Sequence, residues 1–319
     1  MKGQGGLTFV TAEEASLDAF LSVSEGSRHQ EPLRDYAESL VRQQCTTPGW
    51  CVIGLRGGKP TARAALWALP KLPVPTDIVL IDAEWSEADL PVGRELLARV
   101  HELAGELGAV GLSHSLDSPP QAPQYQENED ARIRLLEASG YGLLRDGLRW
   151  TYSGGAASRE KPSVQSLAFR TVSEVGEDAF VEAIAATYHG TRDSWISRNI
   201  EERGTLGAAK ADFLDYQGLE HQPQWWELAY TDDGALAGVS MAAKNPSTAV
   251  IAYVGVVPEQ RGRGLARVLV DRGTERLLEG GAAEIRGDCD QDNVGMVRAF
   301  ERAGFRQFAR RRTYHRALA

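Results

Sequence analysis

The chain has 319 residues, about twice the size of one ordinary domain, so two domains are expected. It holds 35 basic and 44 acidic residues, a net charge of −9, which argues against an overall attraction to nucleic acid or to an anionic membrane. Three cysteines without paired spacing indicate neither a disulfide framework nor a metal site, and they fit a reducing cytoplasm. No membrane-spanning run or signal-peptide pattern occurs, so we expect no membrane partner.

The first half of the chain has the patterning of a mixed α/β domain. Apolar residues recur at helical spacing in some segments, and form short continuous runs, typical of buried strands, in others. The expected elements are helices over 11–23 and 30–44, strands over 51–56, 61–68 and 77–85, a helix over 93–108, a strand over 109–114 and a helix over 130–140. Antiparallel strands thus come early and crossover helices come late.

A small, polar, proline-containing segment at 153–166 is typical of a linker. It separates an expected first domain, 1–152, from an expected second domain, 167–319. The elements expected in the second half are strands over 235–244 and 248–258, a helix over 264–279, a strand over 282–288 and a helix over 293–304. Three consecutive arginines at 310–312 suggest a solvated strand edge.

The two halves resemble each other. "PGWCVIGLRGGKPTARA" (48–64) aligns with "PQWWELAYTDDGALAGV" (223–239), and "RLLEASGYGLLRDGLRWTY" (134–152) aligns with "RAFERAGFRQFARRRTYHR" (298–316). The matches come in the same order, and a proline-rich loop at 113–130 accounts for the extra length of the first half. We therefore predict a duplicated unit and two similar domains.

One stretch has no counterpart in the first half: "VPEQRGRGLARVLV" (257–270). A nearly continuous apolar strand precedes it and a helical pattern follows it, so the turn lies at a helix N-terminus, where backbone amides lack intrahelical partners. Gly262 and Gly264 allow a ligand to approach the backbone closely. The turn therefore predicts a binding site for a phosphate-like anion.

This pattern resembles the acetyl-CoA loop of the GNAT acetyltransferase superfamily, Gln/Arg-x-x-Gly-x-Gly/Ala, here Arg261-x-x-Gly264-x-Ala266. "DNVGMVRAFERAGF" (292–305) is similar to the closing motif of the family. The resemblance covers about 168–317 and implies a mixed sheet flanked by helices. In the first half, acidic Glu84, Glu87 and Asp89 occupy the equivalent stretch, which predicts a degenerate first domain without a cofactor site.

The resemblance implies acetyl-CoA as the acyl donor, no metal, and a small-molecule amine as the acceptor. The pyrophosphate would bind the loop, and the strand before it would supply the oxyanion donor and pair with the pantetheine arm. The cofactor-binding residues so implied are Val254, Val256, Val257, Arg261, Gly262, Arg263, Gly264, Leu265, Ala266 and Asn293.

The catalytic residues are less well indicated. Phe300 stands where the family usually has a tyrosine as proton donor, so Tyr253, Tyr314 and Cys289 remain alternatives, or the thiolate leaves unaided. Glu227, Asp288 and Asp290 are candidate bases near strand ends; from these we take Glu227, Tyr253 and Asp288 as the catalytic set. The unusual stretch "TYHGTRDS" (187–194) offers polar groups to a substrate, namely Tyr188, His189, Arg192 and Asp193.

Three alternatives stay open alongside a small-molecule N-acetyltransferase that is a monomer or homodimer. The chain could be a non-catalytic acyl-CoA sensor, which the missing tyrosine would permit. It could be a mycothiol-synthase-like tandem acetyltransferase, or a protein modifier with an open peptide groove. An expected N-terminal domain closing one side of the site favours small acceptors.

Overall fold

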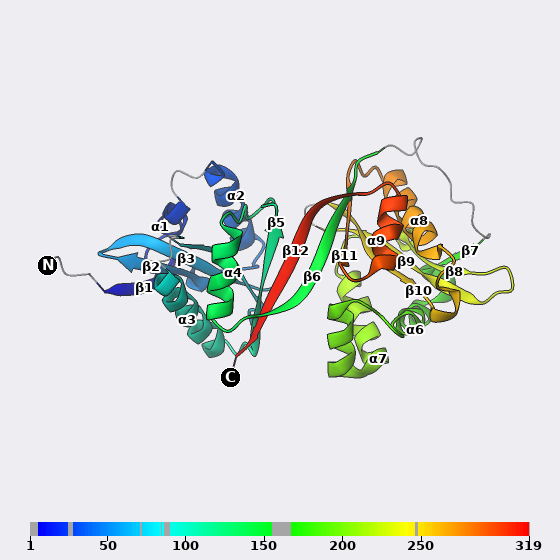
Figure 1. The fold of residues 1–319 in the computed structure, drawn as a ribbon, viewed down its shortest axis with the longest axis horizontal. Coiled ribbons are helices and arrows are strands. Elements are labelled where there is room, and N and C mark those ends of the chain that lie inside the picture. Colours follow the sequence, from blue (N-terminus) through cyan, green and yellow to red (C-terminus); the bar gives the residue numbers. More distant parts are fainter. Residues whose placement is uncertain are drawn as a thin grey trace. The chain divides into compact units, whose positions relative to one another are not determined.

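The structure, a computed structural model, describes residues 6–24, 28–70, 72–83, 85, 90–154, 167–245 and 248–318. Its contacts divide the chain into two compact units, residues 1–144 with 311–319 and residues 145–310. Most of the strands and helices of both units are labelled in Figure 1. No helix in these ranges is both long and apolar enough to cross a membrane.

Unit 1 is a mixed sheet with helices on both faces. Its strands run in the order β1 (Leu7–Thr11), β2 (Cys51–Arg56), β3 (Lys59–Trp67), β4 (Asp77–Ala83), β5 (Gly111–Ser118), followed by the end of β12 (Arg306–Ala317). One face packs on α1 (Leu17–Leu21) and α2 (Gln30–Arg42), the other on α3 (Leu90–Glu106) and α4 (Glu129–Ala138). Side chains alternate between the faces, so Val52 joins the α3 core while Cys51 and Ile53 join the α2 core.

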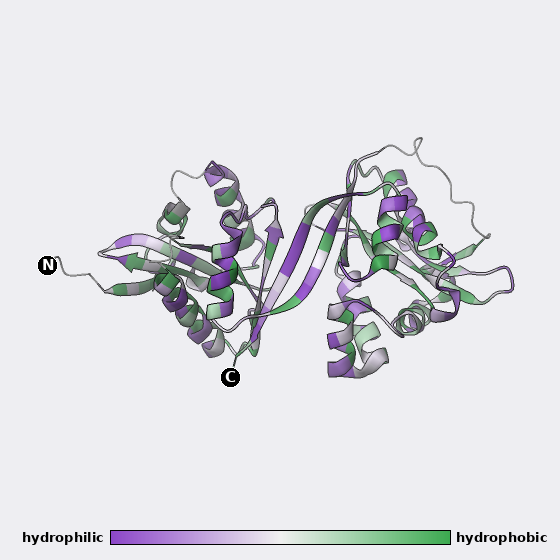
Figure 2. Cartoon of the chain, in the orientation of Figure 1, coloured by the Kyte–Doolittle hydropathy of each residue, from purple (hydrophilic) through white to green (hydrophobic). Residues whose placement is uncertain are grey.

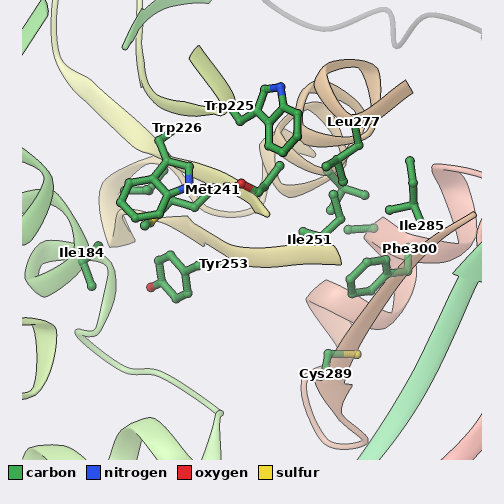
Figure 3. Packing of buried hydrophobic residues seen from close by; sticks show 14 of the residues in the cluster. Ile184, Trp225, Trp226, Met241, Ile251, Tyr253, Leu277, Ile285, Cys289 and Phe300 are labelled. Carbon is green, nitrogen blue, oxygen red and sulfur yellow. Dashed lines mark hydrogen bonds between the residues drawn. The ribbon is translucent and has the colours of Figure 1, made fainter. Parts of the chain in front are cut away.

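Unit 2 repeats this architecture. Its strands run in the order β7 (Ala168–Thr171), β8 (Trp226–Tyr230), β9 (Leu236–Lys244), β10 (Ala249–Val256), β11 (Ile285–Asp290), followed by β6 (Gly142–Tyr152). The helices are α5 (Val172–Val175), α6 (Glu177–Thr187), α7 (Ser194–Gln217), α8 (Leu265–Glu279) and α9 (Val294–Arg302). The main core of the unit includes Phe180, Trp226 and Phe300, each no more than 1% exposed. Trp226 and Phe300 are labelled in Figure 3.

The last strand of each half of the sequence belongs to the other unit. From Arg145 onward β6 is part of unit 2, where it pairs antiparallel with β11 from Gly147↔Asp290 to Tyr152↔Ile285. From Arg311 onward β12 is part of unit 1, where the Ser115 and Thr313 hydroxyls lie 2.9 Å apart. The units therefore divide at 144/145 and 310/311 rather than at the expected 152, and most of the expected linker (155–166) lies outside the described residues.

The three arginines of β12 are paired rather than merely solvated. β12 is largely hydrophilic along its length (Figure 2). Arg310 binds Asp146 within unit 2, and Arg311 binds Asp117 within unit 1 through two bonds of 2.8 Å. Arg312 pairs with Glu129. The interpretation of this run as a solvated edge was wrong, because sequence spacing did not reveal carboxylates more than 160 residues away.

The predicted internal repeat has matching local structure in the two units. Pro48 and Pro223 each begin a 3-10 turn, Pro48–Trp50 and Pro223–Trp225, that leads into a strand and a hairpin. Gly140 and Gly304 both follow a helix with φ of +83° and +82°. The predicted helices and strands are confirmed to within a few residues, except that 11–23 holds only a short helix; no bounds were predicted for the strands β1, β6, β7 and β12 or for the helices α5, α6 and α7.

Candidate cofactor and catalytic site

The glycine-rich turn leaves β10 at Val257, passes through a 3-10 turn at Pro258–Gln260 and enters α8 at Leu265. Gly262 and Gly264 both have φ of +78°, a conformation that residues with a Cβ rarely adopt. A Cβ built on either glycine meets no atom within 4 Å, so the outer surface of the loop is open. The sequence needs glycine here for backbone conformation, and the open surface lets a ligand reach the main chain.

The loop presents unpaired backbone amides. Among the hydrogen bonds of the described residues, the N–H groups of residues 262–266 donate none. Gly264 is the N-cap of α8, no side chain caps the helix, and the 15-residue helix places the positive end of its dipole here. The arrangement suits an anion such as a diphosphate.

Arg261 has a different role from the one that the resemblance implies. Its guanidinium donates to three backbone carbonyls, those of Val256 at 3.1 Å, Thr187 at 2.9 Å and Gly190 at 3.4 Å. These bonds fasten the loop to the end of α6. Arg263 is exposed and donates to the Gln260 side chain at 2.9 Å. Arg261 thus fixes the shape of the loop, while the free amides remain available to a ligand.

β10 and β11 separate as they approach the loop. Their parallel register covers Ala249↔Ile285 and Val250↔Arg286, although β10 continues to Val256 and β11 to Asp290. A bulge between Ile251 and Tyr253 bends β10. Beyond Val250, the edge of β10 that faces β11 has no strand partner among the described residues, so an extended arm of a ligand can pair there like an added strand.

Thr187, Tyr253 and Gly255 pack together where α6 ends beneath β10. A Cβ on Gly255 would stand 2.6 Å from Thr187 Oγ1, so only glycine fits. Tyr253 projects from β10 on the Ile184 side (Figure 3). Thr187 Oγ1 lies 2.7 Å from the Ile184 carbonyl and 2.5 Å from the Tyr253 hydroxyl. Because Thr187 has one proton, which it donates to that carbonyl, Tyr253 donates its own to Thr187.

This bonding pattern limits what Tyr253 can do. Burial raises the pKa of Tyr253 above its ordinary value, so the phenol stays neutral. Its single proton is engaged by Thr187 and is not free for a departing thiolate. Tyr253, predicted to be catalytic, is therefore better placed to hold the strand in position than to donate a proton.

A second buried polar group lies between α6 and α7. The Tyr188 hydroxyl donates to Asp212, which also accepts from Asn199 Nδ2 at 3.0 Å. Both Tyr188 and Asp212 are nearly fully buried, and burial raises the pKa of each. Tyr188, predicted to meet substrate, instead anchors α7 to α6.

Glu227 is committed to an ion-pair cluster. Its two oxygens accept from Arg272 Nε at 2.7 Å, Arg272 Nη2 at 2.8 Å and Arg276 Nη2 at 2.8 Å. Burial raises the pKa of this carboxyl, but the hydrogen bonds from the two arginines outweigh burial and leave the pKa lowered. Both arginines lie on α8, on the face of the sheet opposite Tyr253, so the geometry does not favour Glu227 as a base.

Asp288 lies on the other face. A Cβ on Gly287 would meet Phe300, so Gly287 and Cys289 point to the α8–α9 side and Asp288 to the α6–α7 side, like Tyr253. The Asp288 side chain is 37% exposed and has one ion pair, with Arg149 at 3.5 Å. Of the three candidate bases, Asp288 has by far the most exposed side chain, at 37% against 3% for Glu227 and 4% for Asp290.

Asp290 connects β11 to α7. It binds Arg145 and accepts from the amide and the hydroxyl of Ser194, both at 2.7 Å. Asp193 caps α7 by accepting from the amides of Trp195 and Ile196 at 3.0 Å. Burial raises the Asp193 pKa, and nearby Arg145 opposes that effect. These carboxylates are structural, which removes Asp193 from the groups free to meet a substrate.

His189 and Arg192 are exposed on the loop between α6 and α7, the loop that also carries Gly190, whose carbonyl binds Arg261. The structure thus brings these two predicted substrate residues to the same side of the sheet as Asp288. Their side chains remain the accessible polar groups of "TYHGTRDS", whereas Tyr188 and Asp193 are engaged.

The remaining candidates, Phe300, Cys289, Asn293 and Tyr314, either pack in a core or cap a helix. Phe300 is 1% exposed and stacks on Trp150, with ring centroids 5.8 Å apart. Burial raises the pKa of Cys289 to about 12, so its thiol stays protonated. Asn293 caps α9 by accepting from the Met296 amide at 3.3 Å, and Tyr314 belongs to the core of unit 1.

Three relevant residues escaped sequence reasoning. Thr187, Asp212 and Gly255 have no motif of their own, and each acquires its role from packing against a segment distant in sequence. Only Thr187 lies in a stretch that the sequence marked as unusual, 187–194, and it was not among the residues chosen from that stretch.

The profile of the acetyltransferase (GNAT) family matches residues 187–305. A mycothiol acetyltransferase from Rhodococcus erythropolis is 28% identical over 144 residues, 43% of this chain and 45% of that protein. In these alignments the chain spans about half the length of such curated relatives.

Solved structures share the fold. A GCN5-related N-acetyltransferase from Sphaerobacter thermophilus has a TM-score of 0.60 at 20% identity, covering 98% of this chain and 96% of that one. A tandem GNAT protein from the clavulanic acid biosynthesis pathway has a TM-score of 0.53 at 17% identity, covering 98% and 99%. Residues 187–305 therefore match the acetyltransferase (GNAT) family, and the solved structures share the fold of the chain.

Proposed function

We propose that unit 2 transfers an acetyl group from acetyl-CoA to the amine of a small polar molecule. The observation that carries this proposal is the pairing of two features, the unpartnered amides of residues 262–266 and the unpaired edge of β10. The first suits the pyrophosphate of the donor and the second suits its extended arm. One ligand can reach both the free amides and the β10 edge, because they lie at the same end of the sheet.

The chain's own groups supply a direct-attack mechanism. A backbone N–H on the free edge of β10, within residues 254–256, donates to the thioester oxygen as negative charge develops, since the Val257 amide already donates to the Ala237 carbonyl. Asp288 accepts a proton from the incoming ammonium, directly or through water, since an alkylammonium with pKa about 10 has no lone pair. The thiolate leaves without a side-chain donor, because Tyr253 is engaged and Phe300 carries no proton.

Unit 1 is proposed to bind no acetyl-CoA. β4 and β5 also separate, pairing in register only at Asp77↔Ser113. The chain's own loop occupies that gap: Gln124 Oε1 accepts from the Leu80 amide at 2.8 Å, and Gln126 Nε2 donates to the Ser115 carbonyl at 2.9 Å. Two glutamines thus take the bonds that a cofactor arm would need. The acidic Glu84, Glu87 and Asp89 lie outside the described residues.

The part of the site proposed to bind the acceptor amine carries polar side chains and suits a small molecule. His189 and Arg192 are exposed beside it, and the end of α6 and the start of α7 are held rigidly by Arg261 and Asp290. We propose a small-molecule amine as the acceptor and a monomer or homodimer working in the cytoplasm. The acceptor of the mycothiol acetyltransferases belongs among the first compounds to assay, because such proteins are relatives.

The test is release of free coenzyme A thiol from acetyl-CoA across a panel of amines, with the wild type, Asp288→Asn and Arg170→Lys. Arg170, on β7, is exposed and serves as the control. We expect turnover with at least one amine and a loss of about a hundredfold in the Asp288 variant, the usual size of a general-base effect. Acetyl-CoA binding without turnover on any amine would favour the acyl-CoA sensor.

A further inference from the structure

The loop between α6 and α7, residues 188–193, is called the acceptor loop because it carries the two exposed polar side chains proposed to meet the acceptor, His189 and Arg192. Neither side chain makes a hydrogen bond or an ion pair with another described residue. The loop bonds mainly to itself: the Thr191 amide donates to the Tyr188 carbonyl at 3.0 Å, and the Thr191 hydroxyl accepts from the amide two residues later at 3.2 Å. A segment with few bonds to its surroundings opens at low free energy, so the loop alone does not fix these two side chains.

The two ends of the acceptor loop are anchored to the sheet. At the end of α6, Thr187 Oγ1 lies 2.5 Å from the Tyr253 hydroxyl of β10. At the start of α7, the carboxylate of Asp290 on β11 accepts from the amide and the hydroxyl of Ser194, both at 2.7 Å. We therefore expect any rearrangement of the loop to be confined to its middle, residues 189–192.

The middle of the acceptor loop has one hydrogen bond that reaches another element of the described structure. The Gly190 carbonyl accepts from Arg261 Nη1 at 3.4 Å, which is long for an N–H···O bond. The same guanidinium donates to the Thr187 carbonyl at 2.9 Å and to the Val256 carbonyl, at the end of β10, at 3.1 Å. Arg261 thus joins the acceptor loop to the strand that enters the glycine-rich turn, and the Gly190 bond is the one with room to shorten.

Arg261 also adjoins the loop at 262–266 with its unpaired amides. Gly262 follows it directly, and Gly262 and Gly264 both have φ of +78° with open space around them. Glycines leave a backbone many accessible conformations, and a diphosphate bonded to the free amides would select one of them. That selection fixes the point from which the Arg261 side chain extends. Occupancy of the donor site is thereby transmitted to Gly190 through one side chain.

We propose that Arg261 is a positioning residue that couples the donor site to the acceptor loop: bound acetyl-CoA orders the loop, and a bound acceptor in turn strengthens the binding of acetyl-CoA. This inference rests on the proposed function. Such coupling is reciprocal by thermodynamic linkage, and it arises because the second ligand meets a loop that is already ordered. Arg261 is exposed and its bond to Gly190 is long, so we expect a coupling of about tenfold, near the low end of the roughly 5–150-fold that coupled sites usually show.

The first experiment measures amide hydrogen exchange of the full chain, with and without acetyl-CoA at a concentration that calorimetry shows to saturate each variant. In the wild type, exchange over residues 189–192 should slow about tenfold on binding. In Arg261→Ala the slowing should be less than about twofold. Arg263→Ala is the matched control, because this neighbouring arginine donates to the Gln260 side chain and not to the acceptor loop, and it should slow as the wild type does.

The second experiment measures steady-state kinetics at saturating acetyl-CoA, with an amine that shows turnover. Arg261→Ala should raise the acceptor KM about tenfold and change kcat less than about threefold, because Asp288 and the β10 edge are unaltered. A purely structural defect would instead reduce the active fraction, which lowers kcat and leaves KM unchanged. Arg261→Lys keeps the charge but not the planar fork that reaches three carbonyls. It should behave like Arg261→Ala, and it replaces that variant if the alanine form does not bind acetyl-CoA.

Four results would overturn the coupling while leaving the proposed function intact. They are equal slowing of exchange in the wild type and in both Arg261 variants, no slowing in the wild type with acetyl-CoA bound, an unchanged acceptor KM in both variants, and loss of acetyl-CoA binding in both variants. The last would make Arg261 part of the donor site itself. A wild type that binds no acetyl-CoA would instead refute the proposed function, and the coupling with it.

Discussion

The loop at 262–266 gives the sharpest test of how the cofactor is held. Replacing Gly264 by valine forces a β-branched residue into φ of +78°. Non-glycine residues in this region cost about 1–2 kcal/mol, and a Cβ at this position meets no protein atom within 4 Å, so strain is the main stability cost. The melting temperature should fall by about 2–4 °C per kcal/mol.

The same chain offers a matched control at the other end of α8. Gly281 has φ of +82° and equally open surroundings, so Gly281→Val should lose similar stability. Only Gly264→Val places a branched side chain over the free amides. We expect its acetyl-CoA affinity, measured by calorimetry, to fall by about a hundredfold, which is about 2.7 kcal/mol.

Arg263→Ala completes the comparison. Arg263 is exposed and contributes only long-range charge, so its removal should weaken acetyl-CoA binding by less than about tenfold. Equal affinity losses in Gly264→Val and Gly281→Val would refute the reasoning, because general strain would then explain both. A loss in Arg263→Ala as large as in Gly264→Val would show that charge, and not the backbone, holds the ligand.

Three further outcomes are expected. Acetyl-CoA should bind once per chain in calorimetry, and a stoichiometry of two would contradict the assignment of unit 1. Glu227→Gln should lower the free energy of unfolding in urea by about 1–3 kcal/mol at pH 7, because it leaves the partly exposed Arg272 and Arg276 beside a neutral amide. Since the folded pKa of Glu227 is depressed, the wild type should lose this stabilisation as pH falls below about 4.5, and the variant should not. Phe300→Tyr should change turnover by less than about tenfold and cost about 1–3 kcal/mol by overpacking against Gly287; a hundredfold gain would show that the missing tyrosine limits the enzyme.

The sequence predicted what local patterns encode. The turn at 257–266 combines glycines, a preceding apolar strand and a following helix, and the structure places these elements as expected. The roles of charged residues were harder to predict. Glu227 and Arg261 look like candidates for chemistry in sequence, but their partners lie on other elements and commit them to structure. Spacing along one chain contains no information on such partners.

The strand partners of β6 and β12 could not be predicted from the sequence either, because they are determined by the topology of the whole fold. "GLLRDGLRWTY" has strand-like residues, but nothing in it says that its partner is β11, some 140 residues later. Similarly, the bonds of Gln124 and Gln126 in the gap between β4 and β5 come from a loop at 119–128 that prolines mark only as irregular. Sequence patterns were sufficient to predict most helices and strands and the glycine-rich turn. They were insufficient to predict which distant strands and charged residues pair.

The exchange of β6 and β12 has a consequence for how the protein is made. A ribosome releases the chain from the N-terminus, and domains generally fold in that order. Here the sheet of unit 1 lacks its last strand until β12 has been synthesised, after the whole of unit 2. Until then β5 presents an unpaired edge, which is a template for pairing with another chain. Each half of the sequence thus carries a strand that belongs to the other unit, so that neither half is a self-sufficient product if the chain is cut between them.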